Sequence, residues 1–355
     1  MRNIHSHSHD HDRNYSYDAK QNPTQQHQPY RYPMQKQKPP FSNMDNVQMQ
    51  KAWKQFKRWG QERYLRPQEK DYYSYVIPRM LPDLGRLHHN REHTTITWIG
   101  HSTFLIQMGE LNIVTDPVWA DSMAFEKRIS APGIDIKDMP KIDIILLSHS
   151  HYDHLHLKSI KELAGAHTKF IVPAGLRKKM IRKGFENTHE MHWWEAMDFG
   201  KVRVSFVPAQ HGTRRTLMDG NRSHWGGFVM EHRLSPILRP TETIYFAGDS
   251  GYFRGFTRIG DMFDIDVSLI PIGAYEPEWF MSPQHVSPEQ AVQAFLDVKA
   301  KMMIPMHYGA FKLADDTPRE AIDRLLAARD RHGITPDRIH LAGLGEVFDL
   351  SLLHS

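Results

Sequence analysis

The chain has 355 residues, of which 40% are hydrophobic and 24% are charged, a composition typical of a folded protein with one large core or two modest ones. It contains no cysteine, which excludes a disulfide scaffold, a thiolate metal site and a cysteine nucleophile, so imidazole and carboxylate groups must hold any bound metal. The net charge of +4 is a small excess for this length and favours an anionic partner only slightly. No run approaches the roughly 18 apolar residues that cross a bilayer, and the polar first residues differ from a signal peptide, so we expect a cytoplasmic protein or one at a membrane surface.

Two segments precede the main predicted domain. Residues 1–44 are rich in His, Gln, Asn, Pro and Tyr without apolar periodicity, which predicts a disordered tail. We interpret the alternating histidines at 5–11 as a flexible tract that binds metal incidentally. Residues 45–94 are predicted to form a helical extension, because apolar residues between 46 and 64 recur at approximately helical spacing. This helix either packs on the domain or faces a membrane.

From Thr95 onward, short β-rich runs alternate with helical stretches. The predicted strands are 95–98, 104–107, 112–115, 142–147, 170–172, 202–207, 243–247, 267–270 and 302–306. The predicted helices are 157–164, 176–183, 288–298 and 319–332. This mixture over about 250 residues predicts an α/β domain, residues 95–355, whose sheets are covered by helices.

The densest group of metal-ligand residue types follows the apolar strand predicted at 142–147. It contains His149, His151, Asp153 and His154 within six positions. One tetrahedral ion cannot use all four comfortably, because His149 and His151 point the same way while the other two lie farther round the turn. The sequence therefore predicts two adjacent metal ions.

Three further candidate ligands follow later strands. His211, Asp249 and His307 each come just after an apolar run that is predicted to be a strand. Alone, each histidine would suit a structural role, and Asp249 would suit a turn. Their shared position at successive strand ends favours one metal cluster.

The order of these residues resembles the metal signature of metallo-β-lactamase-fold hydrolases. Within that superfamily, the chain from about Thr95 to Phe348 is similar to N-acyl phosphatidylethanolamine-hydrolysing phospholipases D. The matching stretches are 98–103, 115–117, 148–155, 193–195, 215–219, 246–252, 271–277, 279–281 and 284–286. The long stretch 271–281 is unusual enough to favour this branch over generic lactonases. The resemblance implies an αβ/βα sandwich of two mixed β-sheets flanked by helices.

The resemblance also implies how the candidate ligands would be shared between two zinc ions. One ion would be held by His149, His151 and His211, and the other by Asp153, His154 and His307. Asp249 would bridge both ions and set their separation. Asp153 would in addition orient the hydroxide shared by the two ions.

Other residues are implied to act around the metals. His285 would lie beside the substrate head group and hold or protonate the departing oxygen, with Gln284 and Tyr275 as further substrate contacts. His101 resembles a residue that supports the ligands from behind. Asp116 is predicted to cap the Asp-Pro turn near the site.

The activity implied by the resemblance is that of a phosphodiesterase of phospholipase D type. A hydroxide bridging two zinc ions would cleave N-acyl phosphatidylethanolamine into an N-acylethanolamine and phosphatidic acid. The expected partner is a phospholipid, reached by peripheral contact with a membrane. We expect no nucleic acid partner, and the sequence leaves a homodimer open.

Alternatives remain at this stage. The same ligands would serve a lactonase, or a phosphodiesterase acting on a soluble molecule or a nucleic acid. A non-catalytic protein with a relic metal site would lack a ligand, and none is missing here. A basic cluster either lies against anionic head groups or forms a solvated helix face; it comprises Arg177, Lys178, Lys179, Arg182 and Lys183.

Overall fold

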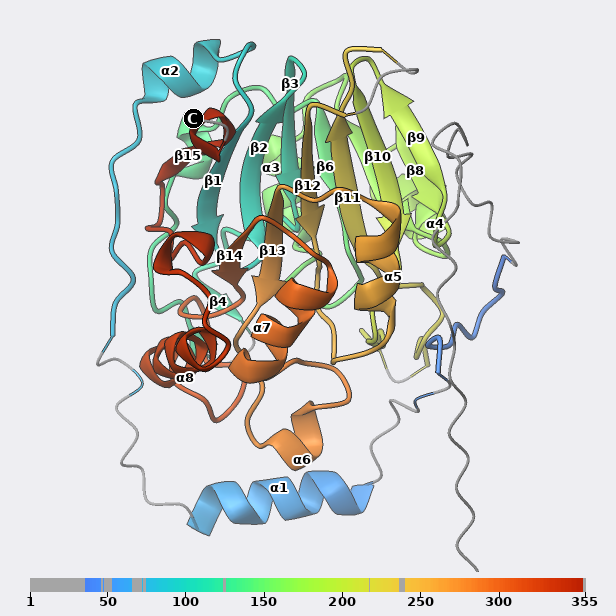
Figure 1. Cartoon of the computed structure of the whole chain (residues 1–355). Coiled ribbons are helices and arrows are strands. Elements are labelled where there is room, and N and C mark those ends of the chain that lie inside the picture. The colour runs from blue at the N-terminus through green and yellow to red at the C-terminus, as the bar shows by residue number, and fades with distance from the viewer. Residues whose placement is uncertain are drawn as a thin grey trace, which may run out of the picture. The chain divides into compact units, whose positions relative to one another are not determined.

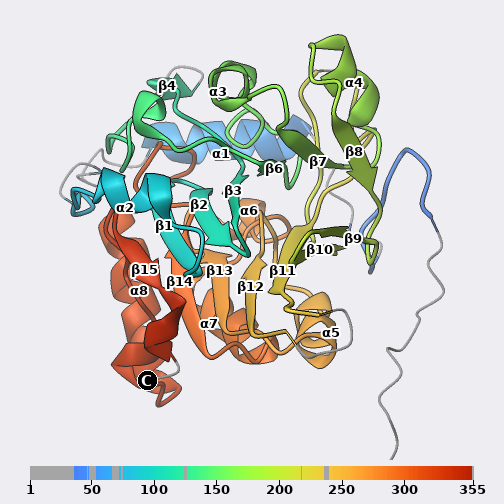
Figure 2. The same cartoon turned by 90° about the horizontal axis from the view of Figure 1, so that it is seen from above.

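The computed structural model of the chain describes residues 36–45, 47, 53–65, 72, 75–123, 126–216, 218–235 and 240–353. Two large β-sheets lie face to face, and helices cover the outer face of each sheet (Figures 1 and 2). This arrangement confirms the predicted αβ/βα sandwich of two mixed sheets. Among the described residues, no helix combines the length and apolarity that a bilayer-spanning segment needs.

The first sheet has seven strands. In spatial order they are β15 (Val347–Asp349), β1 (Thr95–Gly100), β2 (Thr103–Met108), β3 (Leu111–Thr115), β6 (Ile144–Leu146), β7 (Lys169–Pro173) and β8 (Thr188–Met191). The first four pair antiparallel, whereas β3, β6, β7 and β8 pair parallel.

The second sheet has six strands. In spatial order they are β14 (Met302–Met306), β13 (Val267–Pro271), β12 (Glu242–Phe246), β11 (Gly227–His232), β10 (Val202–Val207) and β9 (Ala196–Phe199). Strands β12, β13 and β14 are parallel, and the remaining pairs are antiparallel. Two short strands, β4 (Ser122–Met123) and β5 (Glu126–Lys127), form a separate ribbon.

The described helices lie outside the sheets. They are α1 (Trp53–Leu65), α2 (Leu84–His89), α3 (Leu157–Leu163), α4 (Arg177–Arg182), α5 (Gly255–Met262), α6 (Glu278–Met281), α7 (Pro288–Asp297) and α8 (Pro318–Arg331). Single 3-10 turns occur at Ile136–Asp138, Pro336–Arg338 and Leu350–Leu353. The strands and helices predicted from Thr95 onward are all present, with ends that differ by at most two residues.

The main core lies between the two sheets. Large aromatic side chains from both sheets meet there, each less than 2% exposed: Trp98, Phe104, Phe206, Phe228 and Phe246. A second apolar layer joins the first sheet to its covering helices through Ile160 of α3 and Met180 of α4. Dense packing on both faces of a sheet keeps its strand ends in place, so the loops that leave them are anchored.

The prediction of a disordered tail is wrong near its end, where residues 41 and 43 are buried. Most of residues 1–44 lies outside the described part of the chain, but Phe41 is buried and its ring stacks on His224 with centroids 4.4 Å apart. Asn43 is also buried. One aromatic ring and one hydrogen-bonding amide are enough to attach this segment, although its composition has no periodicity. The segment boundaries at 44/45 and 94/95 otherwise stay a prediction.

Helix α1 packs on the domain. The Trp59 ring stacks on Phe280 with centroids 5.0 Å apart, and its Nε1–H donates to Asp315 Oδ2 at 2.9 Å. Glu62 of the same helix accepts a hydrogen bond from Trp279 Nε1 at 3.0 Å. The sequence predicts that this helix either packs on the domain or faces a membrane. Its Trp59 and Glu62 side chains pack on the domain.

Candidate metal centre

The candidate ligands come from strand ends on one edge of the sandwich. His149, Asp153 and their neighbours follow β6, whereas His211, Asp249 and His307 follow β10, β12 and β14. Strands β10, β12 and β14 run in the same direction in the second sheet, so their carboxyl ends meet at the same edge. All seven ligands predicted from the resemblance meet here.

Three histidines form the first group. His149 Nε2 lies 2.9 Å from His151 Nδ1, and His211 Nε2 lies 3.1 Å from the same nitrogen. His149 and His211 are buried, and burial lowers the pKa of both well below its usual value. Both imidazoles are therefore neutral, which is the form that binds metal ions.

The second group contains Asp153, His154 and His307. His154 Nε2 lies 3.3 Å from His307 Nε2, and Asp153 Oδ2 lies 3.4 Å and 3.6 Å from these two nitrogens. Burial disfavours a charge on His154, but Asp249 and Asp153 outweigh it and raise its pKa well above the usual value. The surroundings of this group thus favour positive charge.

Asp249 lies between the two groups. Its Oδ2 is 3.1 Å from His154 Nε2 and 3.2 Å from His307 Nε2. The same oxygen is 3.9 Å from His149 Nε2 and 4.0 Å from His211 Nε2. The other oxygen, Oδ1, is buried and accepts no hydrogen bond in the described structure. A buried carboxylate with an unused oxygen is costly unless a cation is nearby.

Hydrogen bonds behind the histidines direct their lone pairs into the centre. The Nδ1–H groups of His154 and His211 donate to Asp116 Oδ2 at 2.7 Å and to the Gln284 carbonyl at 3.0 Å. His149 Nδ1 lies 2.9 Å from Ser148 Oγ, which donates its own proton to Asp116. Each of these rings then turns its Nε2 toward the others, and that of His154 carries a proton that a metal ion would displace. Converging lone pairs repel unless a cation binds them, so the donor set fits two metal ions.

The Asp116 side chain holds the ligand-bearing turn, and the predicted cap of the Asp-Pro turn is not among its contacts in the described structure. Besides His154, it accepts hydrogen bonds from the Ser148 backbone N–H at 2.7 Å and from the Ser148 hydroxyl at 2.5 Å. The carboxylate is fully buried, and Asp116 has the positive φ of 33°. Its position fixes both the orientation and the protonated nitrogen of one candidate ligand.

Replacing Asp116 with asparagine is expected to weaken metal binding about 10- to 100-fold. An amide NH₂ facing His154 Nδ1 would move the ring proton to Nε2, where it would block metal binding. Competition with a chelator measures the affinity. Asp143→Asn is the matched control. Asp143 accepts a hydrogen bond from the Asn112 backbone N–H, and it lies at the amino end of β6, whereas the ligands follow the carboxyl end. Equal affinities for Asp116→Asn and the wild type would contradict this role.

His101 and His285 also lie at the centre. His101 Nε2 is 3.0 Å from Asp153 Oδ2, and burial lowers the pKa of His101 to about 3, so a neutral ring donates to the carboxylate. His285 Nδ1 lies 4.0 Å from Asp249 Oδ2, and its ring centroid is 5.3 Å from that of His211. Both residues thus lie next to candidate ligands, whereas the place of His285 beside a substrate and the roles of both residues stay predictions.

Gln284 and Tyr275, the two other predicted substrate contacts, differ from His285 in how they are placed. Gln284 contacts the centre through its backbone carbonyl, which holds His211, and a substrate contact by its side chain stays a prediction. Tyr275 is only 1% exposed, and the Arg324 guanidinium lies over its ring at 4.7 Å. The Tyr275 side chain is thus part of the core, and its contact with a substrate stays a prediction.

The unusual stretch around Tyr275 is a turn held by a buried carboxylate. Asp316 accepts backbone hydrogen bonds from Ala274 and Tyr275 at 3.0 Å and from Glu276 at 3.2 Å. Ala274 has the positive φ of 62°. Asp316 thus shapes the loop that follows β13.

Burial of Asp316 predicts a specific pH dependence of stability. Burial outweighs the three N–H donors and raises the pKa of Asp316 from 3.8 to about 6. A carboxyl pKa raised by folding stabilises the native state below about pH 4, and this contribution is lost as pH rises through 6. The wild type should therefore lose about 2 kcal/mol relative to Asp316→Asn between pH 4 and 7. Urea unfolding of both proteins measures this difference, and a constant difference would contradict the expectation.

Two residues that support the centre were not predicted for this role. Asn43 Nδ2 donates to the His211 carbonyl at 2.9 Å, and its Oδ1 accepts the His211 N–H at 3.0 Å. Arg215 donates to the carbonyls of Ser150 at 2.8 Å and Leu155 at 3.0 Å, which clamps the ligand-bearing turn. Arg215 lies in a stretch matched by the resemblance, but nothing in the sequence around Asn43 indicates its contact.

Comparisons with known proteins agree with this geometry. The family described as "Beta-lactamase superfamily domain" matches residues 111–308. The chain belongs to the metallo-β-lactamase superfamily, and it is a metal-dependent hydrolase of that fold. A solved structure, the metallo hydrolase Igni18 from Ignicoccus hospitalis, aligns with a TM-score of 0.53 and 19% identity, covering 73% of this chain and 98% of that one. This likeness supports the fold.

Two relatives narrow the position within the superfamily. The chain is 33% identical over 289 residues to N-acyl-phosphatidylethanolamine-hydrolyzing phospholipase D 1 of Caenorhabditis elegans, covering 74% of this chain and 78% of the relative. It is 34% identical over 270 residues to the mitochondrial N-acyl-phosphatidylethanolamine-hydrolyzing phospholipase D of Saccharomyces cerevisiae, covering 71% of this chain. The match spans only 56% of the yeast protein. The chain is therefore a homologue of enzymes named for this phospholipase D activity.

Proposed function

We propose that the protein is a zinc-dependent phosphodiesterase that hydrolyses N-acyl phosphatidylethanolamine to an N-acylethanolamine and phosphatidic acid. The observation that carries the proposal is Asp249, whose Oδ2 lies within 4.0 Å of nitrogens from both histidine groups, as a ligand shared by two ions would. The named activity of the two relatives supports the substrate. Imidazole and carboxylate ligands suit zinc, although iron or manganese can occupy similar sites.

The ligands would be divided as the geometry groups them. His149, His151 and His211 would hold one ion, Asp153, His154 and His307 the other, and Asp249 both. When bound, two such ions supply Lewis-acid activation of water and of a phosphoryl oxygen.

The remaining chemistry falls to side chains of this chain. Asp153, held by His101 Nε2 at 3.0 Å, would accept a hydrogen bond from the attacking water and orient it toward phosphorus. The bond between phosphorus and the ethanolamine oxygen would break, and His285 would supply the proton that this oxygen needs to leave.

A substrate panel tests the proposal. The metal-loaded protein is offered N-acyl phosphatidylethanolamine, phosphatidylcholine, a cyclic nucleotide and a lactone, and products are identified by mass spectrometry. We expect N-acylethanolamine and phosphatidic acid in equal amounts from the first substrate, and none with Asp249→Asn. Turnover of only the lactone or the cyclic nucleotide would overturn the lipid assignment in favour of a soluble substrate.

A further inference from the structure

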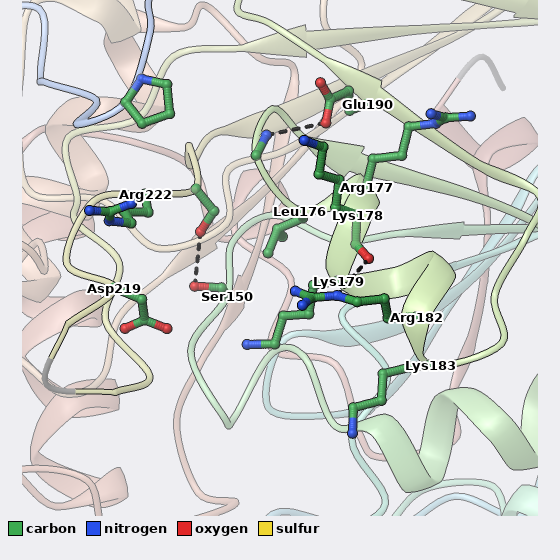
Figure 3. Close-up of a pocket in the computed structure, with 13 residues that line it drawn as sticks. Ser150, Leu176, Arg177, Lys178, Lys179, Arg182, Lys183, Glu190, Asp219 and Arg222 are labelled. Atoms are coloured by element: carbon green, nitrogen blue, oxygen red, sulfur yellow. Dashed lines mark hydrogen bonds between the residues drawn. The ribbon is translucent and has the colours of Figure 1, made fainter.

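A basic groove of about 880 Å³ is lined by residues of α4 and of the ligand-bearing turn (Figure 3). Its wall includes Ser150, which stands in the sequence between His149 and His151, and Ser223, whose hydroxyl contacts that of Ser150 at 3.1 Å. The groove therefore borders the back of the turn that carries two candidate ligands. Six cationic side chains line it: Arg177, Lys178, Lys179, Arg182, Lys183 and Arg222.

The positive charge of the groove is not neutralised by the protein. Within the described part of the chain, none of the six cations has a carboxylate within ion-pair distance. The two acidic residues in the lining are engaged by backbone instead. Glu190 accepts from the Gly175 N–H at 3.2 Å, and Asp219 accepts from the N–H groups of Arg215 and Thr216 at 2.9 Å and 2.7 Å.

Crowding of the cations is visible at Lys179. Burial lowers the pKa of this ammonium group, and the nearby Arg215, Lys183 and Arg182 lower it further, whereas Asp219 opposes them. Figure 3 shows Lys179, Arg182 and Lys183 on the same side of the groove. Like charges held together in this way are relieved by an anion that several of them share.

Two exposed side chains lie next to this charge, the thioether of Met218 and the aromatic ring of Tyr152, and the Arg215 guanidinium lies over one face of that ring at 3.8 Å. Met218, the neighbour of Asp219, is 87% exposed, and Tyr152, in the ligand-bearing turn, is 53% exposed. The two are linked through Arg215, whose carbonyl accepts from the Tyr152 hydroxyl at 3.2 Å and whose N–H donates to Asp219. Apolar side chains that project beside a cationic surface are typical of proteins that bind the interface of an anionic bilayer.

We propose that the basic groove and the two apolar side chains, Tyr152 and Met218, form the surface that docks the protein on membranes containing anionic phospholipid. The proposal rests on the proposed function only in the choice of a lipid surface, which a lipid-hydrolysing enzyme must reach. Phosphate groups of the head-group layer would enter the groove, while Tyr152 and Met218 would insert between lipids. Because Tyr152 lies between His151 and Asp153, docking would hold the ligand-bearing turn at the head-group layer.

Vesicle binding tests the proposal without turnover. The metal-loaded full chain is co-sedimented with vesicles of phosphatidylcholine alone or mixed with phosphatidylglycerol. We expect binding only with phosphatidylglycerol, and at least about tenfold weaker binding for Lys178→Glu/Lys183→Glu. Met218→Asp should also weaken it. The matched control is Lys54→Glu/Lys57→Glu, the same change of charge at two exposed lysines of α1.

Several results would overturn the proposal. One is wild-type binding to both vesicle types alike, and another is equal loss of binding in the α1 variant and the groove variant. Binding of single-stranded DNA, but not of vesicles, that is lost in the groove variant would assign the groove to nucleic acid. Thermal unfolding and metal content show whether each variant is folded. Vesicle binding without hydrolysis of any phospholipid would contradict the proposed substrate and leave the docking surface standing.

Discussion

Replacing Asp249 with asparagine is expected to reduce hydrolysis by at least about a thousandfold and to release metal, while the protein remains folded. The carboxylate is the group that approaches both histidine groups, with Oδ2 at 3.1–4.0 Å from four ring nitrogens. Burial disfavours its charge, but His154 and His307 outweigh it and hold the pKa of Asp249 well below its usual range. An asparagine supplies no charge and only one oxygen, so the two groups would lose their shared ligand.

The control for this variant is another buried aspartate in the same sheet. Asp266 precedes β13 and accepts hydrogen bonds from the Thr243 N–H and from Lys301, at the edge of the sheet opposite the metal centre. Asp266→Asn should lower stability without changing the number of bound ions. Metal analysis and turnover of both variants decide the matter. Full metal content together with wild-type activity in Asp249→Asn would contradict the assignment of this residue.

The second large effect is expected from Gly273→Ala. A Cβ at position 273 would lie 2.2 Å from the His307 carbonyl oxygen, which is far inside van der Waals contact with a backbone atom. His307 has the positive φ of 63° and is also held by a hydrogen bond from its N–H to the His101 carbonyl. The backbone of a candidate ligand must therefore move. We expect a loss of about 2–4 kcal/mol of unfolding free energy, together with weaker metal binding.

Gly220→Ala is the matched control, because nothing lies within 4 Å of a Cβ placed there and the residue is exposed. Denaturant unfolding gives the stability of both variants, and chelator competition gives their metal affinity. Gly273→Ala could instead be as stable as Gly220→Ala and bind metal as tightly as the wild type. That result would contradict the expected effect of the close approach between Gly273 and His307.

The strands that precede the ligands are predictable because they are buried on both faces and therefore consist mainly of apolar residues. Strands β6, β13 and β14 are short apolar runs that are buried along their whole length, so they stand out from their surroundings. Strands β8 and β9 differ because they lie at the ends of their sheets, and each contains one exposed residue and at least one half-buried residue. Their formation depends on pairing with neighbours, which a local pattern does not contain.

The metal centre is predictable for a similar reason. Its ligands are chemically distinctive and lie at the ends of recognisable strands, so their order along the chain indicates their meeting in space. The supporting contacts of Asn43 are different, because an asparagine in a polar segment has many possible partners and only the folded chain selects His211. The motif around Tyr275 carries a contact of the same kind, since only the folded chain brings Asp316 to its backbone.

The measurement that tests the central claim most directly is the metal content of the wild type compared with His149→Ala/His154→Ala. Both proteins carry the same histidine tract at 5–11, so its incidental metal binding cancels in the difference. After dialysis, the wild type should hold about two more zinc ions per chain than the variant. Only the wild type should hydrolyse N-acyl phosphatidylethanolamine. Equal metal content in two folded proteins would contradict a metal centre built on these residues.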